Sequence, residues 1–296
     1  ELDKRRETVL LSIHQQGKLT DELKSKILAV ETMAVLEDIY LPYRPKRRTK
    51  ASIAKEKGLE LLAQKIFAQE GMDPQVEAAD YVDAEKKVNS VEEALAGARD
   101  IIAEWVSEDA RARSRLRALF LDRAVISSRV VRGKEQDGIK YKDYFQWEEP
   151  VKNAPSHRIL AVRRGEKETF LTVRILPPEE EALSILKSLF VRGRGKDAWE
   201  VQSACEDSYK RLLSLSMETE IRLELKKRAD GEAIEIFKSN LRQLLMAPPL
   251  GQKNVLAIDP GFRTGCKLVC LNRQGKLLHH ETIYITDSES QTQAAS

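Results

Sequence analysis

The stretch Val255-Leu-Ala-Ile-Asp259-Pro-Gly-Phe-Arg-Thr-Gly265 decides the fold of the last part of the chain. A short apolar run ends in one carboxylate, that of Asp259, and a turn bounded by glycines follows. Before Pro248 the apolar residues recur at helical spacing, whereas after it they follow the period of β-strands. The change of period predicts three consecutive strands, over residues 254–258, 265–271 and 276–284.

A carboxylate at the end of the first of three antiparallel strands resembles the start of a ribonuclease-H-like domain. In that fold the aspartate binds a divalent metal, and further carboxylates complete a two-metal site that attacks a phosphodiester. Asp259 is therefore the candidate catalytic and metal-binding residue. The later acids do not complete the set, because Glu281 lies on a strand far along from Asp259 and the others fall in the polar end of the chain. The sequence favours a non-enzymatic role, with no cofactor in this chain and Mg²⁺ only if a longer parent protein completes the site.

Two other interpretations of Asp259 stay open. Its side chain could accept hydrogen bonds from nearby backbone amides and hold the turn, which is a structural role. The turn could instead be the first phosphate loop of an actin-like ATPase. Such loops favour small residues, whereas Phe262 and Arg263 are bulky.

The composition limits the class of protein. Charged residues make up 33% and aromatic residues 6% of the 296 residues, which is typical of a helix-rich protein with solvated faces. The net charge is only +3, so a nucleic-acid-binding surface would have to arise from local clusters. No apolar run is long enough for a membrane span, and no signal peptide is visible. We expect a piece of a longer cytoplasmic protein, since the chain does not begin with methionine.

The cysteines are odd in number and lack the spacing of a metal site; they are Cys205, Cys266 and Cys270. We interpret them as core thiols of a protein in a reducing compartment.

Helices are predicted for most of the chain before Pro248. Over residues 3–40 the apolar positions recur at helical spacing, with a stop at Gly17 and a new N-cap at Thr20. The predicted exceptions are a loop-rich connection over 124–150 and a lone hairpin or edge strand over 168–175.

Three further features of the helical region can be tested against a structure. Ser156 is expected to cap a helix. The nearly continuous helical pattern over 197–246 has Gly231 as its one expected interruption. Four arginines alternate with other residues, a spacing that scatters them around a helix and favours a solvated surface; they are Arg111, Arg113, Arg115 and Arg117.

Two short segments carry the cations most suited to meet phosphate. The first follows two prolines and contains Arg44, Lys46, Arg47, Arg48 and Lys50. The second is a glycine-containing loop with Arg192, Arg194 and Lys196. In the functional interpretation they contact phosphates, with Tyr40 and Tyr43 available to stack on bases. In the alternative, the first segment is a solvated connector, or its arginines tie helices together through acids such as Glu37 and Asp38.

Three motifs resemble one known family. Residues 36–58, LEDIYLPYRPKRRTKASIAKEKG, closely resemble a signature of the bacterial Tex family of transcription accessory proteins. The Ser-His-Arg segment over 156–158, which leads to an Arg-Gly turn, is similar to the same family. The motif IDPGFRTG over 258–265 is similar to the opening of the family's YqgF domain, which itself resembles the Holliday-junction resolvase RuvC.

The resemblance implies a mainly α fold. We expect a multi-helix elongated platform with a small β-hairpin region, followed by the first three strands of a truncated ribonuclease-H-like α/β domain. The expected domains are a helical region over 1–247, with a sub-boundary near 124–150, and an incomplete YqgF domain over 252–296. The polar end, 286–296, is expected to be disordered.

The function implied by the resemblance is that of a nucleic-acid-binding transcription accessory factor. In the family, nucleic-acid affinity is attached to an OB-fold RNA-binding domain that follows the YqgF domain. This piece does not contain that domain, so RNA or DNA is expected to bind it weakly. One alternative is a metal-dependent ribonuclease-H-like or RuvC-like nuclease that uses Asp259. The other is a protein-interaction module that docks on RNA polymerase or other transcription proteins.

Overall fold

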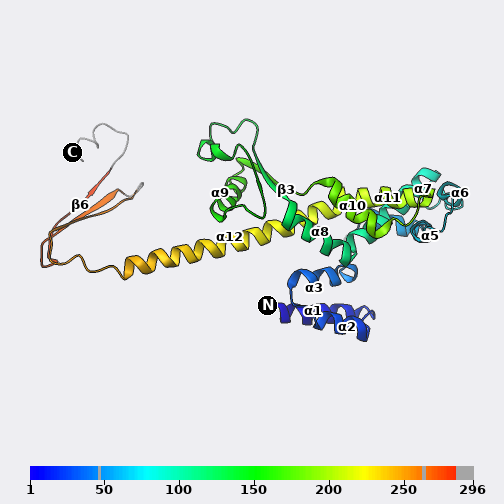
Figure 1. Ribbon diagram of the computed structural model, residues 1–296, viewed down its shortest axis with the longest axis horizontal. Coiled ribbons are helices and arrows are strands. Elements are labelled where there is room, and N and C mark those ends of the chain that lie inside the picture. Colours follow the sequence, from blue (N-terminus) through cyan, green and yellow to red (C-terminus); the bar gives the residue numbers. More distant parts are fainter. Residues whose placement is uncertain (46–47, 262–264, 285–296) are drawn as a thin grey trace. The chain divides into compact units, whose positions relative to one another are not determined.

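The computed structural model describes residues 1–45, 48–261 and 265–284, so the predicted disordered end lies outside the described residues. The chain divides into two compact units, Glu1–Ile234 and Glu235–Ser296 (Figure 1). The fold is mostly helical and includes two small antiparallel sheets, as predicted. No helix in the described part of the chain is long and apolar enough to cross a membrane.

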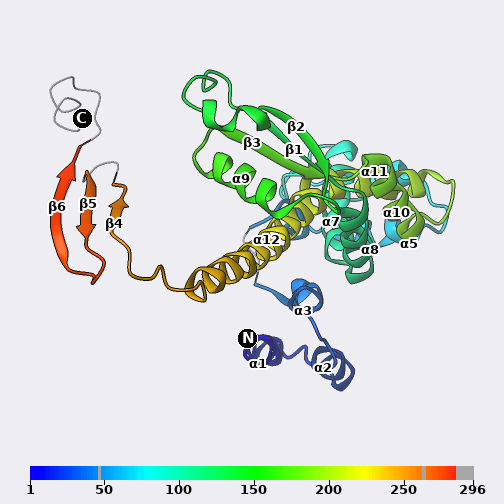
Figure 2. The ribbon, with the colours of Figure 1, turned by 60° about the vertical axis from the view of Figure 1, so that its left-hand side comes forward.

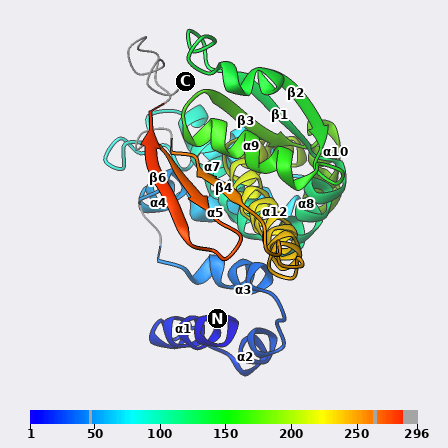
Figure 3. The same ribbon diagram turned by 90° about the vertical axis from the view of Figure 1, so that its left-hand side faces the viewer.

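The first three helices surround a small core of their own. They are α1 (Leu2–Gln15), α2 (Asp21–Leu28) and α3 (Met33–Tyr40). Their core consists of Val9, Ile13, Ile27, Val30, Leu36 and Tyr40. The predicted stop and cap are confirmed: Gly17 has a φ of +68°, and the Thr20 hydroxyl accepts the backbone N–H of Leu23. Figure 3 shows these helices as a group.

The larger core begins after the basic segment and is organised by helix α7 (Val91–Glu108). Its apolar residues form one face, and that face packs against α4 (Lys50–Glu56), α5 (Glu60–Ala68), α6 (Pro74–Ala79) and α11 (Lys196–Ser208). Helix α8 (Ala110–Arg123) follows directly, and its first turn is capped by Asp109. Helix α10 (Glu179–Phe190) packs against α8 and α11.

A three-stranded antiparallel sheet interrupts the helices. Its strands are β1 (Val125–Val130), β2 (Gln146–Pro150) and β3 (Leu171–Leu176), in the order β2-β1-β3. The prediction of an edge strand over 168–175 is confirmed by β3. The prediction of a loop-rich connection over 124–150 is wrong in part, because that segment supplies the other two strands around the 3-10 helix η2 (Ile139–Tyr144). Figure 2 shows α9 (Ser156–Lys167) beside this sheet.

The prediction that Ser156 caps helix α9 is wrong. Pro155 is the N-cap residue, and Ser156 is already in the first turn. The Ser156 hydroxyl instead donates to the Glu232 carboxylate on helix α12 (Ser214–Leu245). The side chain therefore joins two helices rather than ending one.

Helices α11 and α12 are joined by a π-helical stretch, η3 (Tyr209–Leu213). The predicted interruption at Gly231 is wrong, because α12 runs through it without a break. A single glycine costs a helix interior only about 1 kcal/mol relative to alanine, which its helix-forming neighbours can offset. The boundary between the two units falls within α12.

The second unit contains the three strands that the change of period predicted. They are β4 (Val255–Asp259), β5 (Cys266–Leu271) and β6 (Leu277–Ile283), antiparallel in the order β4-β5-β6 (Figure 2). The last two are joined by a turn in which Asn272 Oδ1 accepts the N–H groups of Gln274 and Lys276, at 3.0 and 2.8 Å.

Candidate functional site

The first basic segment lies between the two cores. The 3-10 turn η1 (Leu41–Tyr43) contains Pro42 and ends α3. Helix α4 begins at Lys50, after a reciprocal capping box between Thr49 and Ser52. Arg44, Arg48 and Lys50 are exposed. Lys46 and Arg47, which were also predicted to contact phosphate, lie outside the described residues.

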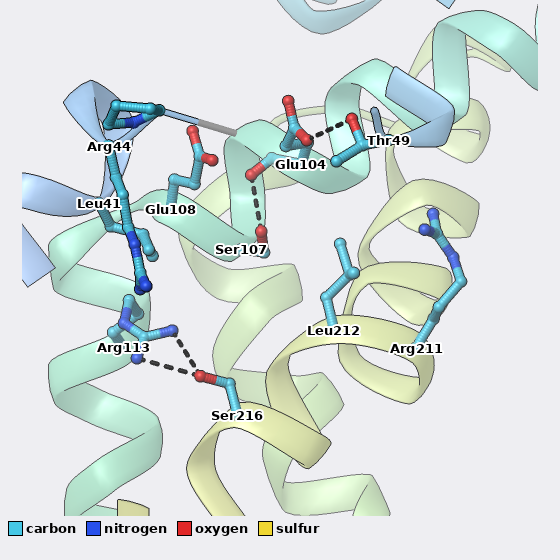
Figure 4. Close-up of a pocket in the computed structure, with 11 residues that line it drawn as sticks. Leu41, Arg44, Thr49, Glu104, Ser107, Glu108, Arg113, Arg211, Leu212 and Ser216 are labelled. Atoms are coloured by element: carbon cyan, nitrogen blue, oxygen red, sulfur yellow. Dashed lines mark hydrogen bonds between the residues drawn. The ribbon is translucent and has the colours of Figure 1, made fainter. Parts of the chain in front are cut away.

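A polar cavity of about 520 Å³ adjoins this segment. Its lining comes from η1 and the residues after it, α7, α8, η3 and the start of α12 (Figure 4). The lining residues are Leu41, Arg44, Pro45, Thr49, Glu104, Ser107, Glu108, Arg113, Arg211, Leu212 and Ser216. The cavity thus brings together parts of the chain that are far apart in sequence.

Three guanidinium groups line the cavity at different depths. The Arg44 side chain extends from the loop toward Arg113 (Figure 4). The side chain of Arg113 is only 10% exposed, and its two terminal nitrogens each lie 3.2 Å from Ser216 Oγ. Arg211 belongs to η3, and its Nη2 donates to Asp100 at 2.9 Å and to Asp207 at 2.5 Å. The hydrogen bond with Asp207 raises the pKa of Arg211 above its ordinary value.

Arg211 lies within the π-helical stretch η3. An extra residue in the turn shifts the side chains that follow it, and such stretches are frequent at functional sites. Leu212, in the same stretch, also lines the cavity. Nothing in the sequence over 209–213 distinguishes this stretch from ordinary helix, so neither residue was predicted.

Carboxylates share the cavity with the cations. Glu104 Oε1 accepts a hydrogen bond from Thr49 Oγ1 at 3.0 Å, and Ser107 Oγ donates to the Glu104 backbone carbonyl at 2.8 Å (Figure 4). Glu108 lies one turn further along α7. These contacts fix the end of the basic segment against α7, so the segment is not simply a solvated connector.

A buried ionic network lies behind the cavity. Because of it, the prediction that the arginines of α8 form a solvated surface is wrong in part. Asp38 is 4% exposed and accepts from Arg113 Nε and from Arg117 Nη2. Arg117 also pairs with Glu220 on α12. Arg113 is therefore buried and Arg117 half-buried against the acids, since residues four apart share one helix face.

The same contacts test the alternative in which arginines of the first basic segment tie helices together through Glu37 and Asp38. Asp38 and Glu37 do tie arginines to α3, as that alternative required, but the arginines do not come from the basic segment. Glu37 pairs with Arg5 of α1, where Arg5 Nε lies 2.5 Å from Glu37 Oε1. Burial acts to lower the pKa of Arg117, yet hydrogen bonds with Glu220 and Asp38 outweigh it and raise that pKa.

The second basic loop lies elsewhere in the first unit. Arg192, Arg194 and Lys196 are exposed, and none of them lines the polar cavity. Lys196 Nζ pairs with Asp73 at 2.6 Å, at the start of α6. The next residue, Asp197, is buried and accepts the N–H groups of Gly71 at 2.7 Å and Ala198 at 2.9 Å.

Asp259 lies at the exposed end of β4, opposite Lys267 of β5. The expectation that Glu281 lies far along from Asp259 is wrong, because the strand register places the two in adjacent rows. Glu281 pairs with Leu268, so its side chain points to the other face of the sheet. Within the described residues, no three acidic, histidine or cysteine side chains gather to hold a metal. Residues 262–264 of the motif lie outside them.

Fold and site together define a helix-rich protein with a basic segment beside a polar cavity and a separate antiparallel sheet. Residues 69–237 match the family model described as Tex central region-like, and residues 253–296 match that of the Tex protein YqgF-like domain. The chain belongs to the Tex family, which confirms the resemblance seen in its motifs.

Several curated proteins are similar along nearly the whole chain. Protein tex of Bordetella pertussis is 41% identical, over 93% of this chain and 37% of its own length. Transcriptional accessory protein Tex of Neisseria gonorrhoeae is 39% identical, over 96% of this chain and 38% of its own length. A human protein, S1 RNA-binding domain-containing protein 1, is 27% identical over 94% of this chain and 29% of its own length. The chain thus spans about two fifths or less of each relative.

Proposed function

We propose that this chain is part of a transcription accessory factor and that its basic segment contacts the phosphates of RNA or DNA. The observation that carries the proposal is the exposure of Arg44, Arg48 and Lys50. Arg44 lines the polar cavity, and Arg48 and Lys50 flank Thr49, which also lines it. The names of the relatives support it, since one is a transcriptional accessory protein and another an RNA-binding domain-containing protein.

The contacts of the segment suit a phosphate ligand. Arg44 has no ion pair with any residue that the structure describes, and the pair between Arg48 and Glu56 is long, at 3.4 Å, and exposed. Exposed pairs contribute little stability, so Arg48 can exchange Glu56 for a phosphate at low cost. Each phosphate that a cation neutralises releases counterions, which gives affinity a steep dependence on salt.

A double charge reversal tests this proposal. The variant Arg44→Glu with Arg48→Glu should weaken binding of single-stranded RNA or DNA by about tenfold or more at moderate salt. It should also reduce the slope of log affinity against log salt by about 1.4, because two contacts are lost at about 0.7 each. Fluorescence anisotropy of a labelled oligonucleotide across a salt series measures both quantities.

The matched control is Lys142→Glu with Lys227→Glu. Both lysines are exposed, no ion pair is recorded for either with a described residue, and the change in net charge is the same. The control should leave the salt slope near that of the wild type. Equal slopes for the wild type and the Arg44/Arg48 variant would show that the segment does not contact phosphate.

A further inference from the structure

A second, smaller cleft lies where helices α5, α7, α8 and α10 meet. Its volume is about 180 Å³. The lining residues are Phe67, Trp105, Asp109, Arg111, Leu189, Phe190 and Arg192. None of them lines the polar cavity beside the basic segment, so the two are separate places on the first unit.

The apolar part of the lining consists of Phe67, Trp105, Leu189 and Phe190. The rings of Phe67 and Trp105 pack edge to face with centroids 5.7 Å apart, and those of Phe67 and Phe190 lie 6.2 Å apart. The side chains of Phe67, Phe190 and Leu189 carry no hydrogen-bonding group. An apolar anchor would bury its whole surface against these side chains, whereas a nucleobase would bury a polar edge and would have to meet the polar residues of the lining, Asp109, Arg111 and Arg192.

The mouth of the cleft is cationic. Arg192 is exposed and forms no side-chain ion pair or hydrogen bond among the residues that the structure describes. Arg111 is 73% exposed, and Asp109, which pairs with it at 3.2 Å, already accepts two backbone N–H groups as the cap of α8. Acidic groups beside the apolar anchor would complement these two arginines.

The backbone at the mouth is held by a residue in an unfavourable conformation. Gln69 has φ +55° and ψ +52°, in the left-handed region that non-glycine residues rarely adopt. From there its side-chain amide donates to the Phe190 carbonyl and accepts the Arg192 N–H, both at 2.8 Å. Such strain persists where surrounding contacts fix a segment, and it gathers at binding sites.

We propose that this cleft receives one aromatic side chain from an acidic segment of a partner protein. A buried aromatic anchor in a fitted pocket, ringed by polar contacts, is the usual centre of a protein interface. Phe67, Trp105 and Phe190 form the walls, and Arg111 and Arg192 meet carboxylates on either side of the anchor. This site is independent of the nucleic-acid contacts proposed for the basic segment.

Trp105 can report directly on the cleft. Replacing Trp147 and Trp199 with phenylalanine leaves Trp105 as the only tryptophan, since the chain has three. The probe is a short peptide with one phenylalanine flanked by aspartates. Its binding should shift the Trp105 emission saturably, and a peptide with alanine in place of phenylalanine should bind at least about tenfold more weakly, a loss of about 1.4 kcal/mol.

Arg192→Glu should weaken binding of the phenylalanine peptide about tenfold, whereas Arg192→Lys should recover part of the loss. Lys142→Glu, with the same charge change at a distant exposed site, should have no effect. Arg44→Glu with Arg48→Glu should also leave peptide binding intact, which separates this proposal from that for the basic segment. Melting curves check that every variant is folded.

Three results would overturn the proposal. The first is the absence of a saturable shift of Trp105 emission at millimolar peptide. The second is equal binding of the phenylalanine and alanine peptides, which would reduce the interaction to general charge attraction. The third is a saturable shift with a single-stranded oligonucleotide that the peptide cannot displace, which would assign the cleft to nucleic acid.

Discussion

Cys205 illustrates how burial sets the chemistry of a single residue. It lies on α11 with no exposed surface, and burial raises the pKa of its thiol from 9.0 to about 12. Tyr209, one helical turn later, is also buried, and its pKa rises from 10.0 to about 12. The interpretation of Cys205 as a core thiol is therefore confirmed, and its protonated form is the one that the fold accommodates.

Stability should fall at alkaline pH because of these two groups. In the unfolded chain the thiol ionises near pH 9.0, whereas in the folded chain it stays protonated until about pH 12. The stabilisation is complete below pH 9 and is lost between about pH 9 and 12, at up to about 1.4 kcal/mol per pH unit for the thiol. Urea unfolding of the wild type and of Cys205→Ala across that range measures the difference.

Cys205→Ala should be less stable than the wild type at neutral pH, yet it should lose stability more slowly as the pH rises. Cys266→Ala, on the second unit, should follow the pH dependence of the wild type. If the wild type and Cys205→Ala lose stability in parallel, burial of the thiol does not set the alkaline limit.

For Asp259, the sequence predicted the position in its strand correctly but not the position of Glu281 relative to it. The apolar run before it predicted its place at the end of a strand, and β4 ends there. The side of the sheet that Glu281 occupies depends on the register of β6 against β5, which one residue of slippage would reverse. The residues around Glu281 do not by themselves determine that register. The predicted distance between Asp259 and Glu281 along the sheet was therefore wrong.

Two helical glycines allow a matched test at the scale of elements. Gly231 is exposed in α12, and a Cβ added there would meet nothing within 4 Å. Gly231→Ala should therefore stabilise the helix by about 0.5–1 kcal/mol, through the lower entropy of alanine in the unfolded chain. Thermal unfolding followed by circular dichroism should show a higher midpoint.

Gly165→Ala should have the opposite effect. Gly165 is buried in α9, and a Cβ there would lie 2.5 Å from Cδ1 and 2.9 Å from Cγ of the buried Leu171, so this side chain or the packing of α9 on β3 would have to shift. Overpacking of this kind costs about 1–3 kcal/mol. A lower midpoint for Gly231→Ala would mean that α12 needs a weak point there, as the predicted interruption implied.

The elements that were predicted correctly carry their own signals, and those that were missed do not. Helices α2, α3 and α7 show apolar spacing and side-chain N-caps, α1 shows the spacing alone, and β4 to β6 show the strand period. Strand β1 has two serines at its centre, and Ser128 is buried only because its hydroxyl donates to the Tyr144 carbonyl at 2.8 Å. Strand β2, with two glutamates, pairs only because β1 is beside it.

The polar cavity was beyond prediction for a related reason. Its lining comes from three regions, 41–49, 104–113 and 211–216, which only the fold brings together. The cations of the first region were predicted from their density. Arg113 and Arg211 were not, because an arginine that will be buried beside an acid has the same local sequence as one in solvent.

At the scale of the whole first unit, the chain has two apolar cores connected by charge. The core of α1–α3 is separate from the larger core, and α3 contacts α8. At that contact Asp38 pairs with Arg113 and Arg117 in a buried setting. Ionic contacts of this kind are strongly destabilised when one partner is removed, because the remaining charges stay buried without compensation.

Asp38→Asn should therefore release the small core from the large one. The amide keeps the shape of the side chain but removes the buried carboxylate shared by Arg113 and Arg117, which keep their pairs with Glu220, at a cost of about 3 kcal/mol. Hydrogen exchange measured by mass spectrometry should rise across α1–α3 while α7 stays protected. The neighbouring change Glu37→Gln should have a smaller effect, below about 1 kcal/mol, because its pair with Arg5 is about one third exposed.

The pattern of exchange, rather than its size, decides whether Asp38 is a joint between cores. If protection falls equally in α1–α3 and α7, the two cores unfold as one unit and the network is only one of its many contacts. If protection falls in α1–α3 alone, the small core can separate while the large one persists. The polar cavity would then open with it, since Leu41 and Arg44 line the cavity from the α3 side and Arg113 belongs to both the cavity and the network. Binding at the basic segment and docking of the small core would in that case be coupled through Arg113, and Asp38→Asn should weaken nucleic-acid binding as well as docking.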